Sequence, residues 1–523
     1  MKRYLLVAAC ALAVMPLAAQ ETYENAKIVT EDLNGTARYV GMGGAMEALG
    51  ADISTIGSNP AGLGLFRRTT ANTSFGVVGQ QGVKDFSYGN KTKMSFDQLG
   101  FVFAHRSGER SFLNFGFNYH KNRDFNHILQ ASDRLIGASQ NKISYAKGLE
   151  GLFDLKVKDG EIVGTGNAFN QLDYLYYNAL MADKDNNYHF NEATGYTMNR
   201  AVRGHVNEYD FNLSGNIGDR FYLGLTIGVK DVLHKQYSEY TEQLVDDKGK
   251  GVGTVTIADE RRIDGSGFDI KMGAIVRPVE ASPFRMGFYI HTPTWYDLTT
   301  QNYTTLANQS TVGLYDKGKS EETYKFKLYS PWKFGLSLGH TVGNYLAFGA
   351  TYEYADYGSI DTRINTGEGY DWYYGDYYET SESDANMNKH TQQTLKGVST
   401  LKVGAEFKVA DNLAFRLGYN YVSPMYRMEG YKDGTVNSPG SFYSSATDYT
   451  NWKGIDRITF GLGYTVGKLN LDLAYQYSKQ TGEFSPFMTY DGGPGSKLSP
   501  CICNPVKVNN ERHQVLLSLG YRF

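Results

Sequence analysis

The pentapeptide GLSLG at residues 335–339 is the feature of the sequence that most directly suggests chemistry. It fits the G-x-S-x-G pattern, in which a serine at a sharp strand-to-helix turn acts as the nucleophile of hydrolases such as lipases. Ser337, however, lies in a run that alternates small and apolar residues, which predicts an uninterrupted strand. Without the turn that would expose the serine, we expect the match to be accidental and the protein not to be an enzyme.

The other chemical motifs are incomplete. Gly41 and Gly43 lack the third glycine and the preceding strand of a dinucleotide site, and no Gly-Lys-Ser/Thr follows them. The histidines are scattered, without the HxxxH pair or Cys/His cluster that suggests a metal or haem site. Cys501 and Cys503 do not have the spacing of a zinc site, and a strained disulfide between them stays open. We therefore expect no cofactor and no metal.

Residues 35–66 (GTARYVGMGGAMEALGADISTIGSNPAGLGLF) are rich in small side chains. Arg38 stands among them, and a glycine-rich run follows at 41–45. The chain must bend at Asn59 and Pro60, because proline fixes its own φ and biases the preceding residue away from the helical region. The apolar residues are small and irregularly spaced. Such a segment cannot make its own core, but it could pack inside a container.

Residues 1–20 have the pattern of a secretory signal peptide, with Lys2 and Arg3 before an apolar run and small residues at its end. The stretch LVAAC at 6–10 mimics a lipoprotein cleavage box, but the apolar run before Cys10 is short and continues past it. We expect Cys10 to be removed with the signal and the chain to be exported.

The rest of the chain predicts the container. Glycine (59) and tyrosine (41) are abundant and proline (12) is rare, and no window after residue 20 is apolar enough for a spanning helix. Segments that alternate apolar with small or polar residues recur as they do in transmembrane barrels. They lie near residues 72–81, 94–106, 112–121, 205–216, 220–230, 267–277, 283–291, 324–338, 344–354, 397–409, 413–422, 455–466, 468–478 and 511–523.

The connections between these segments alternate in length. They are short after every even-numbered strand (107–111, 217–219, 278–282, 339–343, 410–412 and 467) and long after the odd-numbered ones. Outer-membrane barrels have short periplasmic turns, long outer loops and an even number of strands, because every backbone group in the bilayer must be paired. The predicted fold is all-β: a 14-stranded antiparallel transmembrane β-barrel of the bacterial outer membrane, formed by residues 71–523, with residues 21–70 (the hatch) inside the lumen.

The lumen of such a barrel receives charges of both signs. An unpaired cation inside it would be costly, so we expect Arg38 to find an acidic partner among Glu47, Asp52, Asp269, Glu353 and Glu406. If the apolar faces meet lipid, the inward side chains include Asp269, Lys271, Arg285, Lys333, Glu353, Lys402, Glu406, Arg416 and Arg522.

The order of several residues resembles the N-terminal hatch of the FadL family, which comprises outer-membrane transporters of long-chain fatty acids and other hydrophobic compounds such as toluene. The residues that carry the resemblance are Gly35, Ala37 and Arg38, then Gly44 and Ala45, then Asn59, Pro60 and Ala61, with Phe66 behind them. The resemblance implies that a hatch plugs a fourteen-stranded barrel. It also implies that the Asn59-Pro60-Ala61 turn approaches a kink in the third strand, for which Gly116 is a candidate site, where the wall opens sideways.

The outer loops depart from that family's pattern. The loop at 231–266 is heavily charged, and the longest excursion instead follows strand three, at about 122–204. Within it, apolar residues between Phe169 and Met181 have helical spacing, which predicts either a lid helix or packing for a long loop. Aromatic residues near Tyr370 and Trp372, in the loop after strand nine, fit a ligand site or an interfacial girdle. The position of the ligand pocket therefore stays open.

Together these features predict passive inward passage of hydrophobic small molecules through a side opening of a plugged, monomeric barrel. The expected partners are the ligand, outer-membrane lipid and lipopolysaccharide, and the barrel-assembly machinery, which reads the alternating C-terminus that ends at Phe523. Nucleic acid is not expected, because the net charge is only −3. Three alternatives stay open: a channel for haem or another nutrient, a lipase-like barrel enzyme, and a structural or adhesive surface protein.

Overall fold

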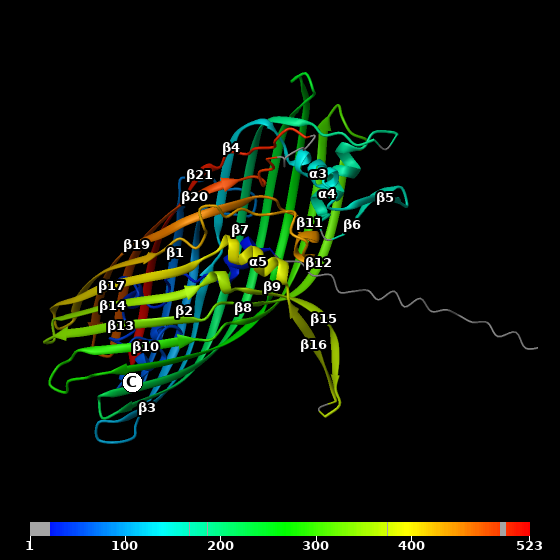
Figure 1. Cartoon of the computed structure of the whole chain (residues 1–523). Coiled ribbons are helices and arrows are strands. Elements are labelled where there is room, and N and C mark those ends of the chain that lie inside the picture. The colour runs from blue at the N-terminus through cyan, green and yellow to red at the C-terminus, as the bar shows by residue number, and fades with distance from the viewer. Residues whose placement is uncertain (1–20, 167, 186, 374, 492–497) are drawn as a thin grey trace, which may run out of the picture.

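The computed structural model describes residues 21–523 except 167, 186, 374 and 492–497, so the expected signal peptide with Cys10 lies outside the described residues. The chain forms a closed antiparallel barrel of 14 strands, as predicted (Figure 1). Each strand pairs with the next one in the barrel, and β1 closes it against β21. The strands are β1 (Thr70–Gln81), β2 (Thr92–Arg106), β3 (Phe112–Asp124), β7 (Glu192–Ile217), β8 (Phe221–Val245), β9 (Gly251–Val276), β10 (Arg285–His291), β13 (Lys333–Val342), β14 (Leu346–Asp356), β17 (Gly397–Ala410), β18 (Leu413–Val422), β19 (Tyr449–Val466), β20 (Leu469–Ser485) and β21 (Val506–Arg522).

The alternation in β8 shows why these residues form a barrel wall. Leu223, Leu225 and Ile227 point outward and are exposed, whereas Tyr222 and Thr226 point inward and are buried. Because side chains alternate along a strand, one face meets lipid and the other the lumen. The same outward apolar belt continues around the other strands.

Short connections join the strands at one end of the barrel, at residues 107–111, 218–220, 277–284, 343–345, 411–412 and 467–468. This confirms the predicted short connections after the even-numbered strands. The predicted long loop at 231–266, after the fifth strand, is wrong: β8 and β9 continue through it and are joined by a short turn at 246–250. At Gly467 the backbone φ is 57°, a left-handed value that glycine adopts at little cost and that a tight turn requires. The C-terminus lies at this same end (Figure 1).

Several strands continue beyond the lipid-facing belt at the other end of the barrel. β7, β8 and β9 are 26, 25 and 26 residues long, and separate segments prolong the wall above β3, β10, β13 and β14. The sequence predicted strands that end sooner. In β8, for example, the outward positions beyond Val229 carry Asp231 and Lys235, so the apolar alternation stops while the backbone pairing goes on. The prolonging segments are β4 (His127–Ala138), β11 (Trp295–Ser310), β12 (Lys317–Tyr329) and the first residues of β15 (Asp361–Asp371), whose remainder pairs only with β16 (Asp376–Ser383).

The stretch at 122–204 is therefore partly barrel wall, since β4 and the first part of β7 belong to it. The remainder holds α3 (Gln140–Leu149), a hairpin of β5 (Asp154–Lys158) and β6 (Glu161–Thr165), α4 (Gln171–Tyr176) and the π-helical turn η3 (Tyr177–Met181). The predicted helical stretch is confirmed. Its apolar side chains, such as Leu172 and Leu175, lie in a buried core that also contains Phe484, as the packing alternative requires.

The connection between β20 and β21 contributes to that same core. Cys501 and Cys503 are both free thiols, and both are buried in it. No strained disulfide joins them in this state of the molecule.

The β15–β16 hairpin leaves the wall and projects sideways (Figure 1). Trp372 at its tip is 90% exposed. Two further helices, α5 (Ala385–Thr394) and α6 (Pro439–Phe442), lie in the outer connections. None of the helices in the described part of the chain is long and apolar enough to cross a membrane.

The hatch consists of α1 (Thr22–Val29), α2 (Ala37–Gly41) and two 3-10 helices, η1 (Ile53–Gly57) and η2 (Pro60–Leu65). Nearly all of its apolar side chains are buried, although no hatch helix is long enough to bury them alone. Instead, Val40 packs against Ala474 and Leu516 of the wall, and Ile56 against Val102. The barrel is the container that the sequence implied.

Candidate functional site

Arg38 is held by the barrel wall. The Thr36 side chain caps α2 by accepting a hydrogen bond from the Tyr39 amide, which fixes the start of the helix that carries Arg38. The Arg38 guanidinium donates to both carboxylate oxygens of Glu406, at 2.9 and 3.1 Å, and to the Ala51 carbonyl at 3.1 Å. The expected acidic partner of Arg38 is confirmed as Glu406.

A second ion pair fastens the next part of the hatch. Glu47 accepts hydrogen bonds from Lys402 at 2.9 Å and from Thr351 at 2.7 Å. Lys402 also contacts Glu353 at 2.9 Å. Several of the inward charges predicted from the alternation therefore bind the hatch rather than line open water.

The Asn59-Pro60-Ala61 turn lies elsewhere than expected. Its buried residues pack on β7, β8 and β9: Asn212 donates to the Pro60 carbonyl at 3.4 Å, and Ala61 contacts Tyr222 and Ile275. A side chain at Gly224 would overlap the Pro60 backbone. The resemblance placed this turn beside strand three, but the path of a hatch depends on which inner-wall positions are small, and a short motif does not reveal that.

Strand three meets a later part of the hatch. Leu63 packs so closely on Gly116 that an added side chain there would overlap it, and Asn114 donates to the carbonyls of Leu63 (2.6 Å) and Phe66 (3.1 Å). Gly116 itself is regularly paired on both sides. The irregularity lies farther along, where the register shifts between Lys121 and Arg123.

Two other hatch residues singled out from the sequence, Gly44 and Ala45, lie near Lys402 of β17 and Gly349 of β14. Gly44 has a φ of 78°, and Ala45 is buried with its carbonyl against Gly349.

The wall is incomplete beside β3. Pairing between β2 and β3 runs from Arg106 to Gln98, opposite His120, and goes no farther within the described residues. We call the space between residues 92–97 of β2 and 121–124 of β3 the β2–β3 gap. Side chains bridge it instead of backbone bonds: Lys93 contacts Asp124 at 3.0 Å, and Lys121 donates to Ser95 at 2.5 Å.

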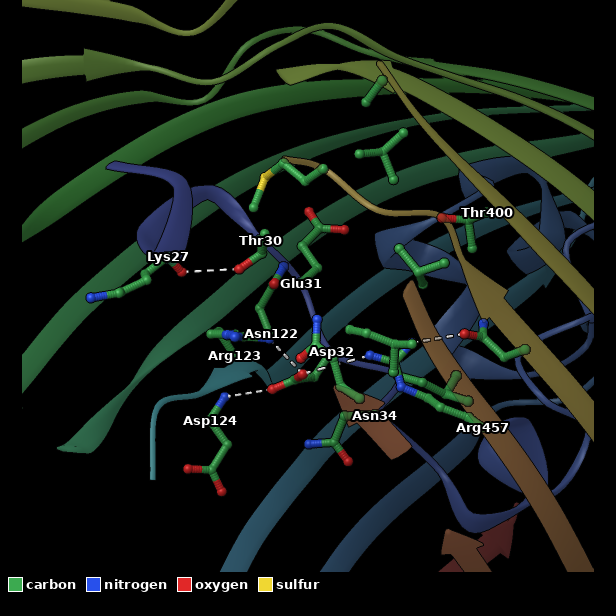
Figure 2. A pocket seen from close by; sticks show the side chains of 18 of the residues that line it. Lys27, Thr30, Glu31, Asp32, Asn34, Asn122, Arg123, Asp124, Thr400 and Arg457 are labelled. Atoms are coloured by element: carbon green, nitrogen blue, oxygen red, sulfur yellow. Dashed lines mark hydrogen bonds and ion pairs between the residues drawn. The ribbon is translucent and has the colours of Figure 1, made fainter. Parts of the chain in front are cut away.

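A cavity of about 260 Å³ lies between the hatch and this part of the wall. Figure 2 shows its polar side, with Asp32 between Arg123 and Arg457. The lining also includes apolar and aromatic side chains, among them Tyr357, Val398 and Trp452.

Two smaller cavities continue from it toward the gap. One of about 50 Å³ shares Asp124 and Arg512 with the large cavity and reaches Val78 and Asp97. The next, of about 20 Å³, shares Val78 and Arg512 and reaches Lys93. The three spaces form a broken path from the lumen to the β2–β3 gap.

The sequence did not single out the residues at the centre of the large cavity, which are Asp32, Arg123, Asp124 and Arg457. A signal was present, because Glu31 and Asp32 are adjacent acids in a segment expected to lie inside the lumen. Such acids need cationic partners, but the alternation alone does not say which wall residues meet them.

His120, Glu208 and Asp210 form a group with ligand atoms close enough to hold a metal ion. The carboxylates are already occupied, however, since Lys271 makes ion pairs with both Glu208 and Asp210. Lys230 adds a contact to Asp269 at 3.1 Å. The group therefore acts as a buried ion-pair network of the wall.

Ser337 lies in the middle of β13, paired with Gly287 and Thr351. It has no strand-to-helix turn around it, so the geometry that a nucleophile elbow needs is missing at this serine.

No family model matches the sequence, and no curated protein matches it. Among solved structures, a FadL homologue of Pseudomonas aeruginosa aligns with 13% identity over 94% of this chain and 99% of that chain, with a TM-score of 0.51. The Ralstonia pickettii toluene transporter TbuX has 13% identity and the P. putida toluene transporter TodX 10%, each over 94% of this chain and 99% of that chain at a TM-score of 0.48. At such identities the likeness concerns the fold. The likeness in fold covers 94% of the chain, which has the outer-membrane barrel fold of a FadL homologue.

Proposed function

We propose that the protein is an outer-membrane channel through which hydrophobic small molecules diffuse inward, leaving the lumen sideways through the β2–β3 gap. The observation that carries this proposal is the row of cavities that leads from the lumen to the only part of β3 without a β2 partner among the described residues. The hatch fills the direct route along the barrel axis with buried side chains. A lateral path would deliver an apolar solute into lipid without crossing water.

The cavity favours a slender solute. Its volume of about 260 Å³ lies just below the range of roughly 300–1,000 Å³ in which sites for drug-sized ligands usually fall. A single hydrocarbon chain or a small aromatic compound fits such a space better than haem, and fatty acids and aromatic hydrocarbons are the substrates that we propose.

Cross-linking the gap tests the route. Lys93→Cys and Asp124→Cys replace the two residues whose side chains bridge it at 3.0 Å, and a short bifunctional thiol reagent would then join them. We expect uptake of toluene or hexadecanol by cells producing the double variant to fall after cross-linking, while the heat-modifiable mobility of the folded barrel is kept.

Each single-cysteine variant, treated with the same reagent, is the matched control and should transport normally. Unchanged uptake in a fully cross-linked protein would contradict the lateral route.

The barrel fold also suggests how the protein is inserted into the outer membrane and what surrounds it there. Phe523 at the end of the chain is 59% exposed, and we propose that the barrel-assembly machinery reads it. We further propose that the outward apolar belt contacts outer-membrane lipid and lipopolysaccharide, and that the protein acts as a monomer.

A further inference from the structure

The barrel has a groove on its outer face, beyond the lipid-facing belt. This outer groove has a volume of about 410 Å³ and crosses β7, β8, β9, β11 and β12, with Tyr88 of the β1–β2 connection at one side. Lys235 in the groove and the lipid-facing Leu225 are an even number of positions apart on β8, so both point away from the lumen. The groove shares no lining residue with the cavity beside the hatch. It is therefore a separate site, open to the surroundings of the barrel.

Three cations lie side by side across the outer groove. The strand pairing places Arg203 of β7 opposite Lys235 of β8, and Lys235 opposite Arg262 of β9. Like charges directly opposite each other on one face of a sheet are destabilising. Among the described residues, Arg262 alone of the three makes an ion pair, with Asp264 at 2.8 Å, and Arg203 lies over the ring of Tyr88 at 5.0 Å. This basic row therefore lacks the counter-charge that an anionic ligand would supply.

An outward cation on another part of the wall has different neighbours. Lys479 of β20 lies two outward positions beyond the exposed Tyr475. The pairing places Lys479 opposite two acids, Asp456 and Glu511, and it contacts Glu511 at 3.4 Å. The basic row is thus not the general pattern of this surface.

The height of the basic row identifies the layer that it meets. Phe268 and Trp295 are paired across β9 and β11, and their rings stack on the outer face with centroids 5.6 Å apart. Such aromatic residues mark the boundary between bilayer and water. Arg262 lies six residues farther along β9, which corresponds to about 15 Å of height at roughly 3.3 Å per residue and a strand tilt of about 40°. At that height the wall of an outer-membrane barrel meets the phosphorylated sugars of lipopolysaccharide rather than its acyl chains.

The rest of the groove suits a saccharide. In the next row of the sheet, Tyr237 lies opposite Glu260, and Tyr303 lies between Glu260 and Glu321. Tyrosine offers a flat apolar ring beside a polar hydroxyl, and carboxylates accept hydrogen bonds from the hydroxyls of a sugar. The two acids disfavour a ligand that is negatively charged along its whole length. Cations in one row and aromatic and acidic groups in the next therefore match a sugar that carries a phosphate group.

We propose that the outer groove is a binding site for lipopolysaccharide, in which Arg203, Lys235 and Arg262 bind a phosphate group and Tyr237 and Tyr303 contact the adjoining sugars. Guanidinium groups donate paired hydrogen bonds to phosphate oxygens, and the lysine ammonium adds a compact charge between them. The bound phosphate neutralises the basic row and fastens the prolonged wall to the outer leaflet. This site goes beyond the channel function and does not depend on it, because neither the hatch nor the β2–β3 gap takes part.

Lys235→Gln tests the site, because it removes the central charge of the row and keeps most of the side-chain length. The probe is rough lipopolysaccharide with a phosphorylated inner core, compared with the same material after removal of its phosphate groups. Its affinity for the purified barrel in detergent would be measured by thermophoresis. We expect the variant to bind the phosphorylated form about fivefold more weakly than the wild type does, and the dephosphorylated form equally. Equal affinity of both proteins for the phosphorylated form would overturn the proposal.

Lys479→Gln is the matched control, because it removes an outward cation that already has acidic neighbours. It should bind lipopolysaccharide as the wild type does, and a loss equal to that of Lys235→Gln would overturn the site in favour of a general effect of charge. Arg203→Gln takes the place of Lys235→Gln should the latter not assemble.

Two further measurements separate the site from simpler explanations. Without lipopolysaccharide, Lys235→Gln should keep or raise the temperature at which heat-modifiable mobility is lost, since it relieves repulsion between like charges. A clear fall in that temperature would assign the lysine a structural role and count against the site. Inorganic phosphate is the competitor: at the same phosphate concentration it should leave lipopolysaccharide bound, and full displacement would show a site for any phosphate and overturn the assignment to lipopolysaccharide.

Discussion

Glu406 shows how one acid on the wall can hold the hatch. Its carboxylate accepts hydrogen bonds from Arg38 of the hatch and, at 2.6 Å, from Arg416 of the neighbouring strand. Arg416 in turn contacts Asp472 at 2.6 Å. The acid is thus shared between the hatch and the wall.

Removing the acid should therefore cost more than removing the hatch cation. Glu406→Gln leaves two guanidinium groups with weakened partners, whereas Arg38→Met leaves Glu406 paired with Arg416. We expect Glu406→Gln to destabilise the folded barrel by about 2 kcal/mol, as for hydrogen bonds to charged groups, and Arg38→Met by less. The temperature at which heat-modifiable mobility is lost measures both, and the reverse order would contradict the shared-acid geometry.

Ala61→Leu tests the position of the Asn59-Pro60-Ala61 turn of the hatch. Ala61 is completely buried against Tyr222 and Ile275. The added bulk should destabilise the seated hatch by about 1–3 kcal/mol, the usual cost of overpacking. Because the turn packs on β8 and β9, we expect uptake to change only as far as the hatch loosens. A complete loss of uptake with a normal melting temperature would instead assign the turn a direct role in the route.

The connection between β20 and β21 contains two buried cysteines, Cys501 and Cys503, whose reactivity can be predicted. Burial raises the pKa of Cys501 and of Cys503 to about 12 in each case. The reactive thiolate is the deprotonated form, so at pH 8 both should resist alkylation in the folded barrel and react after unfolding. Mass spectrometry after iodoacetamide treatment measures this, with fast labelling of the native protein as the contradicting result.

The strands themselves show what the sequence can and cannot predict. Fourteen strands were expected and fourteen form the barrel, because an outward residue such as Leu225 and an inward one such as Thr226 differ in polarity along the lipid-facing belt. The segment predicted at 324–338, however, joins the end of β12 to the first part of β13. Above the belt both faces meet water or protein, so β8 could not be followed past Val229 from polarity alone. The same limit hid the continuation of β3 as β4.

The candidate site was predictable only in part. Inward charges such as Lys402 and Glu406 follow from the alternation, and so does the need of Arg38 for an acid. Which charges meet is a different matter, because it depends on the stagger between neighbouring strands and on the path of the hatch. Asp32 and Arg123 are far apart in the sequence, and nothing local to either one indicates that they touch.

The whole molecule has two distinct ends, and this gives a topological prediction. An epitope tag in the β5–β6 turn at 159–160 or the β8–β9 turn at 246–250 should be accessible to antibody on intact cells. A tag in the short turns at 107–111 or 277–284 should become accessible only after the outer membrane is opened. Reversed labelling would overturn the orientation and, with it, the inward direction proposed for transport.

The glycines of the inner wall restrict which substitutions the hatch and the wall can accept during evolution. The hatch backbone at Met42 lies against Gly404, that at Ala45 against Gly349, and that at Pro60 against Gly224, each so closely that a methyl group on the wall would overlap it. Hatch and wall therefore fit each other closely. We expect that replacing only the hatch, or only the wall, with that of a related protein would produce steric overlap. Related proteins in which a wall glycine is replaced should carry a compensating change in the hatch. Without that change the hatch would seat poorly, and the outer membrane should become permeable to detergents and antibiotics.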